Sequence, residues 1–108
     1  MGGIKSHCPV ETTLQLIGSK WKVLIIRELL TGTKRFGELF RGIAGISQKM
    51  LTQQLRQMEK DRLIRRKVYA QVPPKVEYSL TKSGKSLELV LEAMHQWGER
   101  YSPDECNP

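Results

Sequence analysis

The 108-residue chain is poor in cysteine and histidine, with only two of each. Cys8 and Cys106 lie near opposite ends, which gives too few cysteines for a secreted disulfide framework and the wrong spacing for a zinc site. No apolar run approaches the roughly 18 residues that a membrane helix needs, and no signal-peptide pattern opens the chain. We therefore expect a cytoplasmic protein with no metal, no cofactor and no membrane partner.

The patterns that carry many kinds of catalysis are missing as well. The chain has no paired-carboxylate cluster, no Ser/His/Asp-type set and no phosphate-binding glycine loop. Gly42 and Gly45 are interpreted as turn residues. The sequence predicts a non-enzymatic protein of one domain over residues 1–108, whose hydrophobic share of 39% leaves room for oligomerisation to complete the core.

The net charge of +7 is unevenly distributed along the chain. Residues 20–75 hold 14 Lys and Arg against 4 Asp and Glu, whereas residues 76–108 hold 3 against 6. A basic middle with an acidic end predicts a polyanion-binding surface on the central segment. Binding to a membrane surface and simple solubility are alternative roles for such a basic patch. A membrane-surface helix would need Trp, Phe or Leu opposite the charges in one long amphipathic segment, which this chain lacks.

The segment from Ser47 to Lys60 predicts an amphipathic helix with a basic outer face. Ser47 can cap its start, and an apolar stripe follows at helical spacing. The opposite face has no carboxylate until Glu59, and its side chains are of the kinds that read base edges and phosphates. For this segment alone, a solvated surface helix is the alternative. The expected recognition-helix contacts are Ser47, Gln48, Lys49, Thr52, Gln53 and Arg56.

The segments before this helix predict three further helices. Residues 1–9 are expected to form a flexible arm, and residues 10–30 two N-terminal helices. A third, short helix follows, with Lys34 and Arg35 at its start. Because two helices joined by a tight glycine-containing turn form a helix-turn-helix, we predict that motif over residues 34–62.

Downstream, the hydrophobic period changes from that of a helix to that of strands. Residues 63–69 are rich in β-formers and residues 76–80 alternate strictly, while Pro73 and Pro74 stiffen the loop between them. Residues 63–80 are thus expected to form the wing of a winged helix-turn-helix, a mainly α fold with a small β-hairpin. The basic residues expected to contact phosphates or the minor groove are Lys34, Arg35, Arg65, Arg66, Lys67 and Lys75.

A final helix is expected over residues 81–102, with apolar positions spaced as in a coiled coil. The expected stripe consists of Leu87, Val90, Leu91, Met94, Trp97 and Tyr101. A small winged helix offers little surface to cover so long a helix. We therefore expect this helix and the N-terminal helices to form a homodimer interface. The alternative is that the stripe packs back on its own domain.

Five stretches of the chain together form a recognisable pattern, namely Cys8-Pro-Val10, Leu16-Ile-Gly-Ser-Lys-Trp-Lys22, Phe36-Gly-Glu-Leu39, Gly45-Ile-Ser-Gln-Lys-Met-Leu-Thr-Gln-Gln-Leu55 and Val72-Pro-Pro-Lys-Val-Glu-Tyr-Ser-Leu-Thr81. In these stretches the chain resembles the HxlR-type family of winged helix-turn-helix transcriptional regulators, which are MarR-like. The resemblance implies cytoplasmic homodimers, in bacteria or archaea, that bind double-stranded operator DNA, usually as repressors and sometimes as activators.

Cys8 matches an N-terminal cysteine that some members of this family use to sense electrophiles or oxidants, and that others keep without a known sensing role. In the functional interpretation, Lys5 and His7 at a helix start favour the reactive thiolate. In the other interpretation Cys8 is an inert, buried small hydrophobe. A partnership with Cys106 is open.

Together these features predict a sequence-specific DNA-binding regulator that acts as a homodimer. The resemblance adds the expectation of a repressor that responds to oxidants or electrophiles through Cys8. The alternative is a winged-helix module for RNA or protein interaction without operator specificity. The acid-free outer face of the basic helix argues against a purely protein-binding role.

Overall fold

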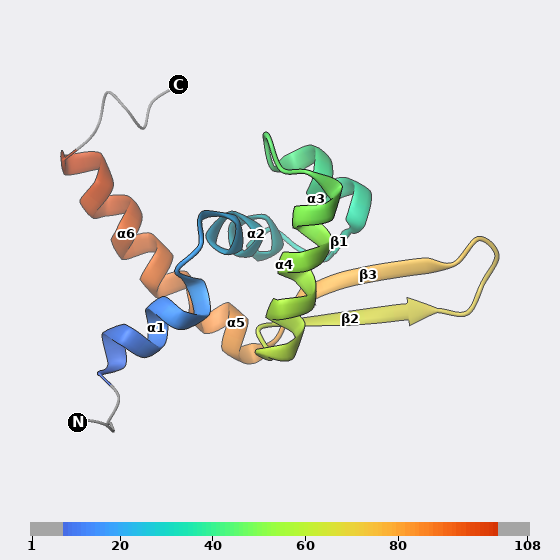
Figure 1. Cartoon of the computed structure of the whole chain (residues 1–108), viewed down its shortest axis with the longest axis horizontal. Coiled ribbons are helices and arrows are strands. Elements are labelled where there is room, and N and C mark those ends of the chain that lie inside the picture. Colours follow the sequence, from blue (N-terminus) through green and yellow to red (C-terminus); the bar gives the residue numbers. More distant parts are fainter. Residues whose placement is uncertain (1–7, 102–108) are drawn as a thin grey trace.

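The computed structural model describes residues 8–101, so residues 1–7 of the expected arm and Cys106 lie outside it. Figure 1 shows α2, α3 and α4 at the centre, the hairpin β2–β3 extending to one side, and α1 and α6 on the other. The elements are α1 (Pro9–Ile17), α2 (Lys20–Leu30), β1 (Lys34–Arg35), α3 (Phe36–Gly42), α4 (Gln48–Lys60), β2 (Ile64–Tyr69), β3 (Lys75–Leu80), α5 (Lys82–Ser86) and α6 (Glu88–Tyr101). No helix in residues 8–101 is long and apolar enough to cross a membrane.

One hydrophobic core joins the central helices to the base of the hairpin. The predicted stripe of α4 is buried, with Leu51 and Met58 fully inaccessible and Leu55 nearly so. Burial of such apolar side chains supplies most of the driving force for folding, about 1.5–3 kcal/mol for each. The buried hydrophobic residues are Ile17, Ile25, Ile26, Leu29, Leu39, Ile43, Ile46, Leu51, Leu55, Met58, Leu63, Ile64 and Leu80.

Local hydrogen bonds fix the helix-turn-helix as predicted. Gly45 has a φ of +84°, a left-handed conformation that favours glycine, and it turns the chain between α3 and α4. Ser47 then caps α4, because its Oγ accepts the backbone N–H of Met50 at 3.0 Å. At the start of α3, the backbone N–H of Arg35 donates to Oε1 of Glu38 at 2.8 Å.

The wing is a three-stranded antiparallel sheet of order β1-β3-β2, not the two-stranded hairpin that the sequence predicts. Lys34 and Arg35, expected at the start of a helix, instead form β1, with Lys34 opposite Tyr78 and Arg35 opposite Glu77. A two-residue strand is too short to show a hydrophobic period, and only its pairing with β3 defines it. The expected loop is also shorter, because Lys75 already belongs to β3.

The expected single C-terminal helix is wrong, since two helices, α5 and α6, meet at Leu87. The N–H of Leu87 bonds to the carbonyl of Gly84, one residue closer than in an α-helix, and this tightens and ends α5. Thr81 caps α5 by accepting the N–H of Gly84 at 3.1 Å, and its hydroxyl donates to the carbonyl of Arg62 at 2.7 Å. Thus α5 is tied to the junction of α4 and β2, and α6 leaves in a new direction (Figure 1).

Candidate nucleic-acid interface

The outer face of α4 carries the predicted recognition residues around one open concavity of about 920 Å³. Since the buried stripe fixes the rotation of α4 against the core, the polar positions between its members must face outward. The predicted residues that line the concavity are Gln48, Lys49, Thr52, Gln53 and Arg56. All of them are exposed except Thr52, which is half-buried. The structure therefore brings together five of the six side chains named from the sequence.

Ser47, the sixth, lies at the N-terminus of α4, where its Oγ serves as the helix cap. A hydroxyl that accepts one hydrogen bond still has its own hydrogen to donate. The side chain is exposed and can use that hydrogen outside the protein. In the structure, the contact that the Ser47 side chain makes is the capping bond at the start of α4.

Four further side chains border the concavity and were not among the predicted contacts. Gln57, Glu59 and Lys60 lie on α4 beyond Arg56, and Phe36 reaches the concavity from the start of α3. Glu59, the first carboxylate along this face, is half-buried. The helical period alone could have found Gln57 and Lys60, because each lies four residues after a predicted position. Phe36 could not be placed from the sequence, because its position at the concavity depends on the tertiary arrangement of α3 and α4.

The neighbouring residues Gln53 and Gln54 of α4 lie in different environments. Gln53 is exposed on the outer face, whereas Gln54 is half-buried. The amide Nε2 of Gln54 donates to Sδ of Met50 at 3.4 Å, and its Oε1 accepts the hydroxyl of Ser19 at 3.4 Å. Ser19 also caps α2, so Gln54 links α4 to the start of α2.

The predicted basic residues of the wing lie on two faces of the sheet, which the sequence did not indicate. Strand register places Lys34 and Arg66 on the face of Tyr78, toward α4. There Nε of Arg66 lies 3.6 Å from Oε1 of Glu59, near the C-terminal end of α4. The same register places the others on the opposite, outer face, namely Arg35, Arg65, Lys67 and Lys75.

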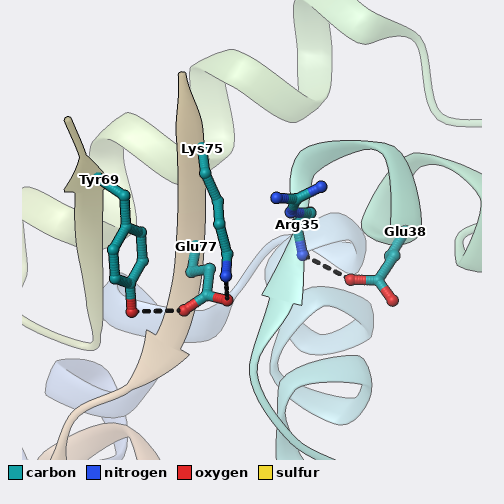
Figure 2. A network of polar contacts seen from close by, with 5 residues as sticks. All are labelled: Arg35, Glu38, Tyr69, Lys75 and Glu77. Carbon is teal, nitrogen blue, oxygen red and sulfur yellow. Dashed lines mark hydrogen bonds and ion pairs between the residues drawn. The ribbon is translucent and has the colours of Figure 1, made fainter. Parts of the chain in front are cut away.

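On this outer face, Glu77 lies at the centre of a polar cluster (Figure 2). The hydroxyl of Tyr69 donates to Oε1 of Glu77 at 2.9 Å, and Nζ of Lys75 lies 3.3 Å from Oε2. The hydrogen bond from Tyr69, followed by the contact with Lys75 and the charge of Arg35, outweighs burial and lowers the pKa of Glu77. The ammonium groups of Lys67 and Lys75 lie 4.9 and 4.8 Å from the centre of the Tyr69 ring.

The apolar stripe predicted for dimerisation divides into two parts. Leu87, Val90 and Leu91 are half-buried and pack against the domain's own core. Met94, Trp97 and Tyr101 are exposed, at 51%, 63% and 61% of their surface. The rings of Trp97 and Tyr101 stack on each other, with their centres 4.3 Å apart.

Helix α1 adds exposed apolar side chains beside those of α6. Val10 and Leu14 of α1 line a cleft together with Val90 and Met94 of α6, and Leu89 is the most exposed apolar residue of α6. These residues extend the exposed apolar surface across both helices. The sequence did not reveal Leu89, because it falls outside the a/d spacing of the predicted stripe.

Cys8 is the residue before α1 and is exposed. Its backbone carbonyl accepts the N–H of Thr12 at 3.0 Å, and its side chain makes no capping bond. The interpretation of Cys8 as a buried small hydrophobe is therefore wrong. Lys5 and His7, which were expected to favour its thiolate, lie outside the described residues.

Comparison with known proteins agrees with this geometry. The model of the HxlR-like helix-turn-helix family matches residues 16–106. The HTH-type transcriptional regulator YdeP of Bacillus subtilis (strain 168) is 55% identical over 94 residues, which cover 87% of this chain and 73% of that relative.

Solved structures show the same fold. The redox regulator HypR in its oxidised form is 52% identical, with a TM-score of 0.80 over 86% of this chain and 96% of that one. A MarR-family regulator from Porphyromonas gingivalis W83 is 38% identical, with a TM-score of 0.83 over 90% and 95% of the two chains. These likenesses confirm the predicted winged helix and identify a transcriptional regulator rather than an enzyme. The chain belongs to the HxlR-like helix-turn-helix family of transcriptional regulators.

Proposed function

We propose that this regulator is a cytoplasmic homodimer that represses transcription by binding operator DNA through the outer face of α4. The observation that carries the proposal is the convergence of five polar or basic side chains of α4 on one open concavity. The buried stripe beneath them holds these side chains on a rigid element. A face of this composition fits the major groove, which is wide enough to admit an α-helix.

The side chains of α4 divide by chemistry into base readers and phosphate binders. Gln48 and Gln53 can pair with the N6 and N7 atoms of adenine, and Arg56 with O6 and N7 of guanine. Lys49 suits phosphate contacts, which position the protein without reading sequence. On the wing, Arg65 and Lys67 are exposed basic residues that can follow the DNA backbone beside the recognition helix.

A second copy of the chain is the proposed partner for the apolar surface of α1 and α6. Met94, Trp97 and Tyr101 on α6, together with Val10 and Leu14 on α1, are large apolar side chains that are more than half exposed. Apolar side chains gathered in this way mark an interaction surface. Two-fold pairing through this surface would set the two α4 helices roughly 34 Å apart, one turn of DNA.

Cys8 is the proposed sensor of electrophiles or oxidants. Its exposed thiol precedes α1, next to the apolar surface that would join the two copies. Addition of the thiolate to an electrophile such as a quinone forms a carbon–sulfur bond and places a bulky group at that surface. Likeness to HypR, which is described as a redox regulator, supports this role.

DNA binding is tested on the region upstream of the protein's own gene and of its divergent neighbour, at two salt concentrations. We expect a preferred site and an affinity that falls steeply with salt, because each neutralised phosphate releases counterions. Weak binding everywhere without a preferred site would contradict the proposal and favour an RNA- or protein-interaction module.

Sensing by Cys8 is tested by treating the protein with diamide or a quinone before measuring operator affinity. The wild type should change its affinity, and the Cys8→Ser variant should not. Equal affinities before and after treatment of the wild type would remove the sensing role while leaving the DNA-binding proposal intact.

A further inference from the structure

Glu77 is an acidic residue at the centre of an otherwise basic face. It lies on β3, the middle strand of the sheet, directly opposite Arg35 of β1 and Lys67 of β2. Its carboxylate is held from two sides, by the hydroxyl of Tyr69 at 2.9 Å and by Nζ of Lys75 at 3.3 Å (Figure 2). An acidic group at this place opposes phosphate binding if only its charge matters.

The geometry of the neighbouring lysines indicates a different effect. Lys67 and Lys75 both place their ammonium groups within 5 Å of the centre of the Tyr69 ring. Two like charges drawn to one ring repel each other, and long lysine side chains lose rotamer freedom when they are held. The carboxylate of Glu77 offsets both costs, because it binds Lys75 directly and fixes the Tyr69 ring through the hydroxyl.

We propose that Glu77 is a positioning residue for DNA binding, which holds Lys75 directly, and Lys67 through Tyr69, in one orientation on the outer face of the wing. The proposal rests on the DNA-binding function proposed above. In this arrangement the wing presents two ordered ammonium groups to the phosphates, and one carboxylate strengthens the binding of a polyanion. Arg35 on the neighbouring strand extends the same row of basic side chains toward α3.

The proposal and simple electrostatics predict opposite changes in DNA affinity for Glu77→Gln. Removing a negative charge from a basic surface should tighten DNA binding if charge alone decides. If Glu77 positions the lysines, the variant should bind roughly three- to tenfold more weakly, the effect of one net hydrogen bond. It should also flatten the slope of log Kd against log salt by about one unit, because one ordered phosphate contact is lost.

The experiment uses the full chain and a duplex of mixed sequence, since phosphate contacts act on all sequences alike. Fluorescence anisotropy at several salt concentrations gives Kd and its salt slope for the wild type, Glu77→Gln and Tyr69→Phe. Glu92→Gln is the matched control, because Glu92 is exposed on α6 and the variant makes the same change in charge away from the wing. Tyr69→Phe leaves the charge unchanged and should weaken binding in the same direction as Glu77→Gln.

A double-mutant cycle tests whether Glu77 acts through Lys75. In a Lys75→Gln background, Glu77→Gln should have less than half of its effect on Kd in the wild type, because the positioned ammonium is already gone. The proposal would be overturned if Glu77→Gln lowered DNA affinity as much in the Lys75→Gln background as in the wild type. It would also be overturned if Glu77→Gln bound DNA as tightly as Glu92→Gln does.

A readout on the free protein separates this proposal from the proposed function. Hydrogen exchange of the backbone amides of β2 and β3 should quicken in Glu77→Gln and Tyr69→Phe, and stay at the wild-type rate in Glu92→Gln. Unchanged exchange in Glu77→Gln would overturn the positioning role whatever the protein does with DNA. If the wild-type protein shows no salt-dependent binding to DNA, the proposed function itself is overturned instead.

Discussion

The α-carbon of Gly84 lies against the carbonyl oxygen of Leu63 so closely that no side chain fits between them. Gly84 is buried in α5, and Leu63 directly precedes the first strand of the hairpin. This contact and the hydrogen bonds of Thr81 hold α5, and with it the start of α6, to the junction of α4 and β2. The relative placement of the proposed DNA-binding and dimerisation surfaces depends on this junction.

Substitution of this glycine should destabilise the fold. In Gly84→Ala the new methyl group must push apart two backbone segments, at a cost of about 1–3 kcal/mol. Gly98→Ala on α6 is the matched control, because a Cβ at Gly98 meets nothing within 4 Å. Urea unfolding followed by circular dichroism measures the free energy of unfolding of both variants. Equal stability of both variants would show that the close approach is relaxed at little cost.

Ser47 offers a way to separate helix capping from DNA contact. Ser47→Ala loses the bond to the N–H of Met50 and should lower the free energy of unfolding by about 1 kcal/mol. Ser47→Asp keeps a capping oxygen, but it brings a negative charge to the N-terminus of α4, next to Gln48. We therefore expect normal thermal stability and weakened DNA binding for Ser47→Asp. Full DNA affinity in that variant would place the N-terminus of α4 away from the phosphates.

The adjacent glutamines of α4 form a matched pair. Gln53→Ala should keep its stability and lose discrimination at one base pair, by about 1–3 kcal/mol. Gln54→Ala should lower stability and leave sequence preference unchanged, because it removes the link to Ser19. The measurement is the ratio of the affinity for operator DNA to the affinity for random DNA. An unchanged ratio in Gln53→Ala would show that Gln53 does not read a base.

The exposed aromatic pair on α6 should be required for dimerisation. Trp97→Lys places a charge in the proposed interface, so sedimentation velocity should show a shift from dimer to monomer. Gln96→Lys is the matched control, because it adds the same charge at the neighbouring exposed position outside the apolar stripe. Dimers of undiminished stability in Trp97→Lys would assign pairing to another surface.

Glu77 should give the protein a distinct loss of stability in acid. The hydrogen bond from Tyr69 and the charges of Lys75 and Arg35 hold the pKa of Glu77 below its ordinary value of 4.5. Such a carboxylate stabilises the fold above the unfolded-state pKa, and this contribution is lost as the pH falls through the lower, folded-state pKa. Below pH 4.5 the wild type should therefore lose more stability than Glu77→Gln. The measurement is the free energy of unfolding in urea at several pH values. An equal loss in the wild type and in Glu77→Gln would contradict this prediction.

The helical part of the protein could be predicted because its signals are local. The apolar stripe of α4 and its serine cap define both the helix and its outward face, so five side chains that line the concavity could be named from their spacing. Pro73 and Pro74 likewise mark the loop of the wing, and the structure keeps them outside the strands.

Features that depend on distant pairing could not be predicted in this way. β1 exists only through its register with β3, and the two faces of the wing follow from that register. The placement of α5 depends on the close approach of Gly84 to Leu63, a residue distant in the sequence. The apolar surface shared by α1 and α6 depends on the same tertiary arrangement.

Hydroxyl-radical footprinting of the wild-type protein on its preferred upstream site tests the proposed dimeric DNA complex most directly. We predict two protected half-sites related by two-fold symmetry on one face of the duplex, with centres roughly 34 Å apart. The protection should disappear in Trp97→Lys. A single unsymmetrical footprint, or uniform weak protection along the whole fragment, would contradict a dimer that inserts its two α4 helices into successive major grooves.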